Sequence, residues 1–307
     1  MTATLALVAI TGLVILAIAW SFRRPIYFAA LTALGRNQYA TVSQVLKVPF
    51  HQKGKNVSPA WVATQMKVLE EDPVGFTHYQ TPIGNIWVPK GTPFLAHLVA
   101  ETIYRHYGVG EQAVKQGDVV VDGGANVGVF VLDSLNRGAK KVIAFEPSGE
   151  NLECLRRNFP NEIRDGRVVI VPKGLWDKTM VVRFAVFSGD QSVNKIIGEG
   201  EIAPAGSQVF EIPVTSVDEC KRELNLPRID YIKLDIEGAE RHALEGARDT
   251  IQNDKPRLAV CMYHLDDDIT VLPHKILGTN PTYKIESGLC LADGSRWRLR
   301  PHILFFI

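Results

Sequence analysis

Cysteine is scarce in this sequence. Four cysteines occur in 307 residues, and no two of them have the CxxC spacing; they are Cys154, Cys220, Cys261 and Cys290. Such isolated cysteines supply neither the ligand cluster of a structural zinc site nor the framework of a disulfide-rich domain. We therefore expect reduced, buried thiols, as in a reducing compartment, and we assign no metal ligands from cysteine spacing.

The chain also carries almost no net charge. The 34 Lys and Arg residues nearly balance the 33 Asp and Glu residues, which leaves a net charge of +1 at pH 7. A chain with so little charge has no overall field that attracts polyanions, so we expect no nucleic-acid partner. The hydrophobic fraction of 46% is ordinary for a globular protein of this length, and the oligomeric state is not indicated.

Charged side chains are absent from residues 1–22, which are almost entirely apolar. A run of about 20 such residues can span a bilayer as a helix. The alternative is a cleaved signal peptide, but that normally begins with positive residues, whereas here Arg23 and Arg24 follow the apolar run. We therefore predict a single-pass membrane anchor over residues 1–24, with the rest of the chain on the cytoplasmic side.

Two parts follow the predicted anchor, without internal repeats. Residues 25–110 are predicted to form a membrane-proximal lead-in, with helical patches at Pro59–Glu71 and Phe94–Tyr107 around a strand-like stretch. Residues 111–307 are predicted to form the catalytic domain, because short apolar strands there alternate with helices.

The strands of this second part are continuously apolar, as expected for a sheet that is covered on both faces. We expect them at 118–122, 141–146, 167–172, 229–235 and 257–263, with a closing strand at 302–307. Two more β-rich runs lie between residues 179 and 213. The alternation of strands and helices predicts a doubly wound α/β fold with right-handed crossovers.

The first strand ends in a glycine-rich turn, VVVDGGANVG. Gly123, Gly124 and Gly128 allow a tight turn and close approach to the backbone. The turn lacks the middle glycine of GxGxxG, which helps a helix N-terminus to hold a pyrophosphate. Asp122 and Asn126 suit the sulfonium and amino-acid groups of S-adenosylmethionine better than they suit a diphosphate. The alternative is a purely structural strand-to-helix turn.

Glu146 lies 24 residues after Asp122, at the end of the next strand. An acidic residue about 20 positions after a glycine-rich turn is placed to bind both hydroxyls of a ribose. The alternative is a charge that stabilises the start of the following helix, and both roles are compatible.

Three segments together resemble the FkbM-type methyltransferases, namely VVVDGGANVG, IAFEPSGENLECLRRNF and IDYIKLDIEGAERHALEGA. The last is the most specific, and the resemblance extends from about residue 81 to residue 268. It implies a mostly parallel, seven-stranded class I methyltransferase sheet with S-adenosylmethionine as the methyl donor. It also implies O-methylation of a hydroxyl, with sugars or polyketide-type metabolites as frequent acceptors. We predict a small-molecule or lipid-linked acceptor, such as a sugar, a glycolipid or another small metabolite.

Candidate catalytic residues follow the fourth and fifth strands of the predicted sheet. Asp235 and Glu237 follow one strand and His264 follows the other, so we expect all three at the carboxyl edge of the sheet. Each is a candidate base for the acceptor hydroxyl. The alternatives are alignment of the acceptor alone, a metal held at Asp235 or Glu237, or a structural hydrogen bond from His264. Glu240 and the aspartates 266–268 are expected at helix starts.

Two other classes of function remain open at this point. One is a nucleotide-cofactor oxidoreductase, which the missing GxGxxG pattern disfavours. The other is a binding module without catalytic activity. The combination of Asp122, Gly124, Glu146 and Asp235 disfavours this class, because a module without an active site has no physical need for all four.

Overall fold

The computed structural model describes residues 30, 32–34, 58–187, 195–197, 202–203, 205–288, 290–293 and 298–307. It has two compact units, Met1–Asn56 with Leu289–His302 and Val57–Gly288 with Ile303–Ile307. The predicted anchor at residues 1–24 lies outside the described residues. Within the described part, no helix is long and apolar enough to cross a membrane. In the smaller unit, strands β14 (Cys290–Asp293) and β15 (Arg298–Pro301) pair antiparallel.

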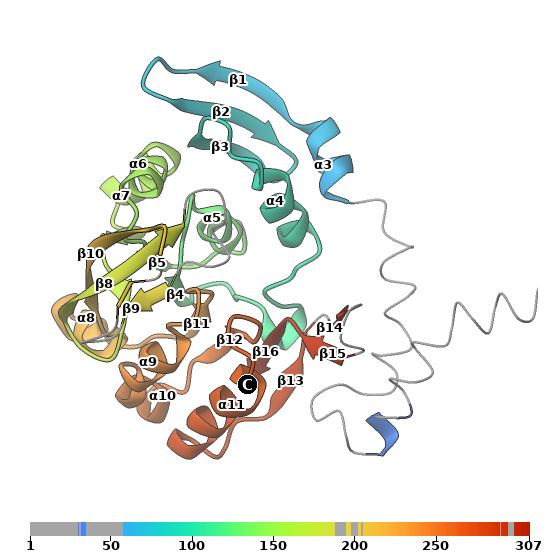
Figure 1. Cartoon of the computed structure of the whole chain (residues 1–307), viewed down its shortest axis with the longest axis vertical. Helices are drawn as coiled ribbons and strands as arrows, with labels where there is room; N and C mark the ends of the chain where they lie inside the picture. The colour runs from blue at the N-terminus through green and yellow to red at the C-terminus, as the bar shows by residue number, and fades with distance from the viewer. Residues whose placement is uncertain are drawn as a thin grey trace, which may run out of the picture. The chain divides into compact units, whose positions relative to one another are not determined.

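A seven-stranded sheet forms the centre of the larger unit, in the order β13-β16-β12-β11-β4-β5-β6 (Figure 1). Its strands are β4 (Val119–Gly123), β5 (Lys141–Phe145), β6 (Val168–Val171), β11 (Tyr231–Leu234), β12 (Arg257–Cys261), β13 (Ile285–Ser287) and β16 (Ile303–Phe306). The strands from β12 to β6 run parallel to one another, and β16 is antiparallel to both of its neighbours. The predicted α/β fold with a mostly parallel, seven-stranded sheet is confirmed.

Helices lie on both faces of this sheet. The helices that follow β4 in the chain are α5 (Val129–Asn136), α6 (Gly149–Asn158), α7 (Pro160–Arg164), α8 (Val217–Glu223), α9 (Glu240–Glu245), α10 (Arg248–Asn253) and α11 (Asp268–Thr279). Figure 1 shows α5 and α6 on one side of the sheet and α8 to α11 on the other. This double cover explains the apolar sequence VVV at the start of β4, where every residue is buried. Cys154, Cys220 and Cys261 are buried free thiols, as the sequence predicts.

A smaller sheet precedes the central one in the chain. Its strands β1 (Lys67–Glu71), β2 (Phe76–Thr81) and β3 (Gly84–Pro89) lie between helices α3 (Pro59–Gln65) and α4 (Leu95–Ile103); the short 3-10 helix η1 (Gly110–Gln112) follows. The predicted helix at Pro59–Glu71 is therefore wrong in its second half. Helix α3 ends at Gln65, and the helix-forming sequence KVLEE pairs with β2 instead, because the strand ladder outweighs a weak local propensity.

The smaller sheet packs with the helices of the central one. Val62, Ile86 and Val99 share an apolar core with Val127 and Cys154. The part of the predicted lead-in that belongs to the larger unit, residues 58–110, thus packs with the predicted catalytic domain. The limits 25–110 and 111–307 stay predictions.

Asn158, the last residue of α6, ties the smaller sheet to the turn after β4. Its amide group donates to the backbone oxygen of Val127 at 2.8 Å and to that of Trp87 at 3.1 Å. Its Oδ1 accepts from the Trp87 N–H at 2.6 Å. One side chain therefore holds strand β3 and the turn together.

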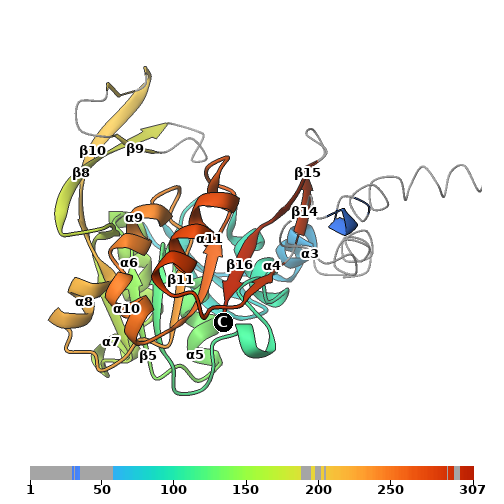
Figure 2. The same ribbon diagram turned by 90° about the horizontal axis from the view of Figure 1, so that it is seen from below.

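The two β-rich runs predicted between residues 179 and 213 form a separate sheet. Its order is β7-β10-β8-β9, and its strands are β7 (Gly174–Leu175), β8 (Met180–Phe187), β9 (Lys195–Ile197) and β10 (Ser207–Thr215). Figure 2 shows β8, β9 and β10 standing out from the helices.

Candidate functional site

The glycine-rich turn after β4 fits closely against its neighbours. Gly124 has a φ of +75°, and a Cβ there would lie 2.1 Å from the backbone oxygen of Asp235. Gly128 has a φ of +93°, and its Cβ would lie 2.4 Å from the ring of Phe159. A Cβ at Gly123 would lie 3.0 Å from a backbone oxygen of β11. The turn therefore requires glycine for two reasons: its backbone conformation, and the close packing of the turn against neighbouring segments of the same chain.

Glu146 follows β5, and each of its carboxylate oxygens accepts a backbone hydrogen bond. Oε2 accepts from the Asn126 N–H at 2.8 Å, and Oε1 accepts from the Ser148 N–H at 2.9 Å. Asn126 has a φ of +50°, and Ser148 is the N-cap residue of α6. The side chain of Asn151 also hydrogen-bonds to this carboxylate, and the two oxygens together still have lone-pair capacity for a further donor. Both roles predicted for Glu146 are therefore compatible with its geometry.

The charge of Glu146 is set by two opposing effects. Burial raises its pKa above the ordinary value, and the hydrogen bonds from Ser148, Asn126 and Asn151, which favour the carboxylate, offset only part of this effect. The side chain is also nearly inaccessible, with 6% of the residue exposed. The sequence predicted both Glu146 and Asn126, and the structure brings them into direct contact.

Asp122 and Lys233 form a buried ion pair behind the turn. The Oδ1 atom of Asp122 lies 3.0 Å from the Nζ atom of Lys233, its neighbour across β4 and β11. The same Nζ donates to the backbone oxygens of Gly123 and Gly124, at 3.2 and 2.8 Å. Asp122 is fully buried and thus faces Lys233, and its predicted contact with a cofactor stays a prediction.

Sequence reasoning assigned no role to Lys233. The only signal was the position itself, because a lysine inside an apolar strand is almost never buried without a partner. Burial lowers the pKa of Lys233, but the negative charges of Asp122 and Asp235 outweigh this effect and raise it. The ammonium group therefore stays charged beneath the turn.

Asp235, which directly follows β11, accepts hydrogen bonds from two tyrosines. The Tyr107 hydroxyl donates to Oδ2 at 2.8 Å, and the Tyr263 hydroxyl donates to Oδ1 at 3.0 Å. Burial raises the pKa of Asp235, but His264 and Lys233 outweigh it and hold the pKa well below its usual range. A carboxylate stabilised in this way accepts protons poorly, so Asp235 is better suited to hold its neighbours in place.

His264 lies among three carboxylates, and it brings the predicted catalytic residues together. Its Nε2 is 3.3 Å from Asp235 Oδ1 and 3.6 Å from Glu237 Oε2, and its Nδ1 is 2.8 Å from Glu240 Oε1. Burial lowers the pKa of His264, but its interactions with Asp235 and Glu240 outweigh this effect and raise the pKa to about 10. At neutral pH the ring is therefore a cation, which favours its alternative role as a hydrogen-bond donor over that of a base.

Glu237 differs from its neighbours in exposure and in backbone conformation. Its side chain is 54% exposed, whereas Glu240 is fully buried. Its φ is +54°, and such a conformation costs a residue other than glycine about 1–3 kcal/mol and is typical of functional sites. Burial of its inner part raises the pKa of Glu237, which the charge of His264 opposes. Glu237 is thus the accessible proton acceptor of the cluster.

The aspartates after His264 begin helix α11, as predicted. Asp267 is the N-cap residue, and the Oδ2 atom of Asp268 accepts from the Leu265 N–H at 2.6 Å. Arg241 forms ion pairs with both aspartates. These groups are therefore engaged in fixing the helix start.

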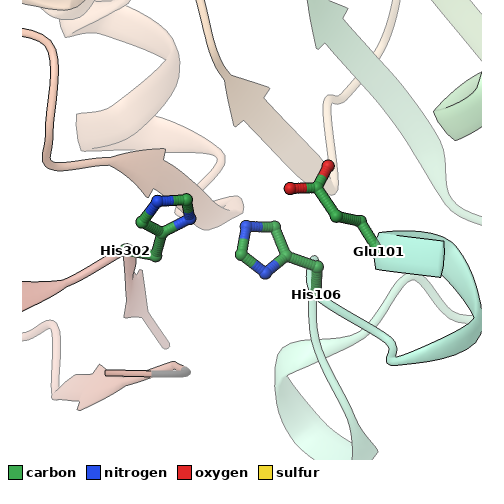
Figure 3. Close-up of side chains that lie close together, drawn as sticks. All are labelled: Glu101, His106 and His302. Carbon is green, nitrogen blue, oxygen red and sulfur yellow. The ribbon is translucent and has the colours of Figure 1, made fainter. Parts of the chain in front are cut away.

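Glu101 is a carboxyl group near Asp235 that sequence reasoning missed. Figure 3 shows Glu101 on α4 with its neighbour His106; His302, also drawn, belongs to the smaller unit. Burial raises the pKa of Glu101 to about 7, the charge of Asp235 adds to this effect, and Lys233 opposes it. The local sequence of α4 gave no signal, because the effect comes from elements far away in the chain.

Comparison with known proteins agrees with this geometry. Residues 122–279, more than half of the chain, match the family model of the methyltransferase FkbM domain. An FkbM methyltransferase from Methylobacillus flagellatus has a similar structure, with 20% identity and a TM-score of 0.50. The match covers 95% of this chain but 60% of that protein, so the chain spans less than two thirds of its length.

Two further solved structures resemble the chain less closely. A precorrin-6y C5,15-methyltransferase from Geobacter metallireducens has 13% identity and a TM-score of 0.34, over 62% of this chain and 79% of that one. A putative methyltransferase from Streptococcus mutans in complex with SAH has 11% identity and a TM-score of 0.37, over 64% of this chain and 90% of that one. No curated protein sequence matches the chain.

Proposed function

The chain belongs to the FkbM methyltransferase family, and on that premise we propose that it transfers a methyl group from S-adenosylmethionine to a hydroxyl oxygen. The acceptor is a small or lipid-linked molecule, such as a sugar or a glycolipid. The observation that carries the proposal is the geometry of Glu146, a buried carboxylate held by one backbone hydrogen bond on each oxygen. It lies at the carboxyl edge of the sheet, where such folds bind their ligands.

The donor end of the site fits S-adenosylmethionine. Glu146 would accept hydrogen bonds from the two ribose hydroxyls at the lone pairs that the backbone leaves open, one of them in place of the Asn151 side chain. Gly124 and Asn126 give the turn the conformation that directs the Asn126 N–H to Glu146. When bound, S-adenosylmethionine supplies a methyl group that its sulfonium has already activated. The residues of this chain then have to align the acceptor and remove its proton.

The acceptor end is supplied by the loops after β11 and β12. As the acceptor oxygen would take the methyl carbon and the bond from that carbon to the donor sulfur would break, the acceptor proton would pass to the accessible carboxylate of Glu237. Asp235 stays ionised and holds the hydroxyl groups of Tyr107 and Tyr263. His264 stays protonated and faces Glu237, so that it stabilises the carboxylate form of the base.

Binding and transfer experiments test the proposed function. We expect the full-length protein to bind S-adenosylmethionine in calorimetry and not to bind NAD, which an oxidoreductase would use. With a methyl-labelled donor, a panel of sugars, glycolipids and small hydroxylated metabolites should yield a product labelled at an oxygen atom. Binding of NAD without binding of S-adenosylmethionine would refute the proposal.

Replacement of the proposed base gives a separate prediction. Glu237→Gln should lower the turnover number by about 10²–10⁴-fold, the usual contribution of a general base. The dissociation constant of the donor should not change, because Glu237 lies outside the donor end. Glu245→Gln is the matched control, since Glu245 pairs with Lys275 on the surface of α9 and α11. Equal turnover in the two variants would leave alignment alone as the catalytic effect.

We further propose that residues 1–24 anchor the protein in a membrane, with the catalytic domain on the cytoplasmic side. The support is the apolar run of residues 1–22, which is followed directly by Arg23 and Arg24. Deletion of residues 1–24 should move the protein from the membrane fraction to the soluble fraction. Donor affinity should be preserved, because the donor residues lie between Asp122 and Glu146. A truncated protein that still sediments with membranes would show that the anchor lies elsewhere.

A further inference from the structure

Glu240 is a buried carboxylate that the proposed chemistry does not use. It is the first residue of α9, and none of its surface is exposed. Its Oε1 atom accepts a hydrogen bond from the Ile236 N–H at 2.9 Å and lies 2.8 Å from His264 Nδ1. An acid at a helix start is normally solvated, and burial without a partner would be costly. The position of Glu240 therefore requires the cation that it faces.

The ring of His264 connects this buried carboxylate with the site. On the Nδ1 side it faces Glu240, and on the Nε2 side it faces Asp235 and Glu237. The ring of Tyr263, two residues after the end of β12, packs on it with a centroid distance of 4.3 Å. Among the described residues, the ionisable groups beside His264 thus come from the loop after β11, the start of α9 and the segment after β12.

Since Nδ1 points to Glu240, the Nε2–H must point to the two carboxylates of the site. A histidine whose two nitrogens both face carboxylates donates with both and accepts with neither. The buried acid thus decides which way the ring is oriented and which form it takes, as an orienting carboxylate does for a histidine in other active sites.

We propose that Glu240 is a positioning residue: it fixes the orientation and charge of His264, so that Nε2 faces Asp235 and Glu237, and the charged ring in turn keeps Glu237 a carboxylate that is ready to accept a proton. The proposal rests on the proposed function only for the role of Glu237. Loss of the Glu240 charge should lower the proton affinity of His264, so that the ring becomes neutral at a lower pH than in the wild type. Once the ring is neutral, Glu237 loses the cation that favours its carboxylate form.

The titration of His264 tests this role without any acceptor. In full-length protein labelled with ¹³C-histidine, the His264 signal is assigned from its loss in His264→Gln. In the wild type, we expect this signal to keep its protonated position through neutral pH and to titrate near pH 10, in line with its raised pKa of about 10. In Glu240→Gln the midpoint should fall by at least about one pH unit, a tenfold loss of proton affinity.

Two comparisons complete the experiment. Glu240→Asp keeps the charge and should recover part of the shift, whereas the control Glu245→Gln should leave the His264 midpoint unchanged. A wild-type midpoint near the ordinary value of about 6.5 would overturn the proposal before any variant of Glu240 is needed. So would a Glu240→Gln midpoint equal to that of the wild type.

The dependence of turnover on pH separates positioning from a merely structural role. With any acceptor that the wild type methylates, turnover should fall on the alkaline side where His264 loses its proton. In Glu240→Gln this alkaline limb should move to lower pH by as much as the histidine midpoint does, while the donor dissociation constant is unchanged. An alkaline limb that stays in place would overturn the link to Glu237. If the wild type transfers no methyl group, the proposed function fails, and the histidine titration still decides the role of Glu240 towards His264.

Discussion

Gly124→Ala should abolish donor binding and destabilise the protein by about 3 kcal/mol or more. The reason is steric and conformational at once. The new Cβ would lie 2.1 Å from the backbone oxygen of Asp235, and the residue has a φ of +75°. Since a backbone oxygen cannot move aside as a flexible side chain can, the turn and the end of β11 must separate.

Denaturant unfolding and calorimetry with S-adenosylmethionine measure the two effects. Gly149→Ala is the matched control, because Gly149 lies in the first turn of α6 and a Cβ there meets nothing within 4 Å. The control should bind the donor normally, and its stability should be unchanged or slightly higher. If Gly124→Ala binds the donor as the control does, the turn is not the donor site.

Glu146→Ala should raise the dissociation constant of S-adenosylmethionine at least about tenfold. Each hydrogen bond to a charged group contributes about 1.5–3 kcal/mol, and the substitution removes two ribose contacts. It also removes the acceptor for the Asn126 and Ser148 N–H groups. Calorimetry measures the affinity, and denaturant unfolding measured alongside reports how much of the change comes from a loosened turn.

Glu150→Ala is the control for the charge at this end of α6. Glu150 lies in the first turn of α6, four residues after Glu146, and is exposed, so its removal changes the local charge without touching the glycine-rich turn. We expect its donor affinity to match that of the wild type. A folded Glu146→Ala variant with the same affinity would contradict the ribose assignment.

The central sheet could be predicted from the sequence because burial on both faces leaves a direct trace. Each parallel strand from β4 to β12 reads as a short apolar run between turn residues, and the observed bounds differ by only a few residues from those predicted. Lys67–Glu71 has no such trace. Its five residues are all exposed, so neither periodicity nor burial could reveal a strand that pairing with β2 creates.

The sequence predicts those residues of the candidate site that follow a strand of the sheet. The ends of parallel strands meet at one edge, which brings Asp235, Glu237 and His264 together. Tyr107 and Glu101 come from α4 and the turn after it, more than 120 residues earlier in the chain. Their place beside Asp235 depends on tertiary packing, for which the local sequence has no pattern. The protonated state of His264 likewise follows from neighbours on three elements.

The hydrogen bonds of Asn158 bear on where the chain can be divided. A recombinant fragment that began at residue 111 would contain every predicted donor contact, yet it would lack Trp87, to which Asn158 donates and from which it accepts. An amide that loses these partners has to find others, and the partner it keeps is the carbonyl of Val127 in the donor turn. A fragment that keeps these contacts therefore has to start before β3, and because Val62 of α3 belongs to the same apolar core as Val127, a start before α3 preserves both. No predicted donor contact lies on these segments.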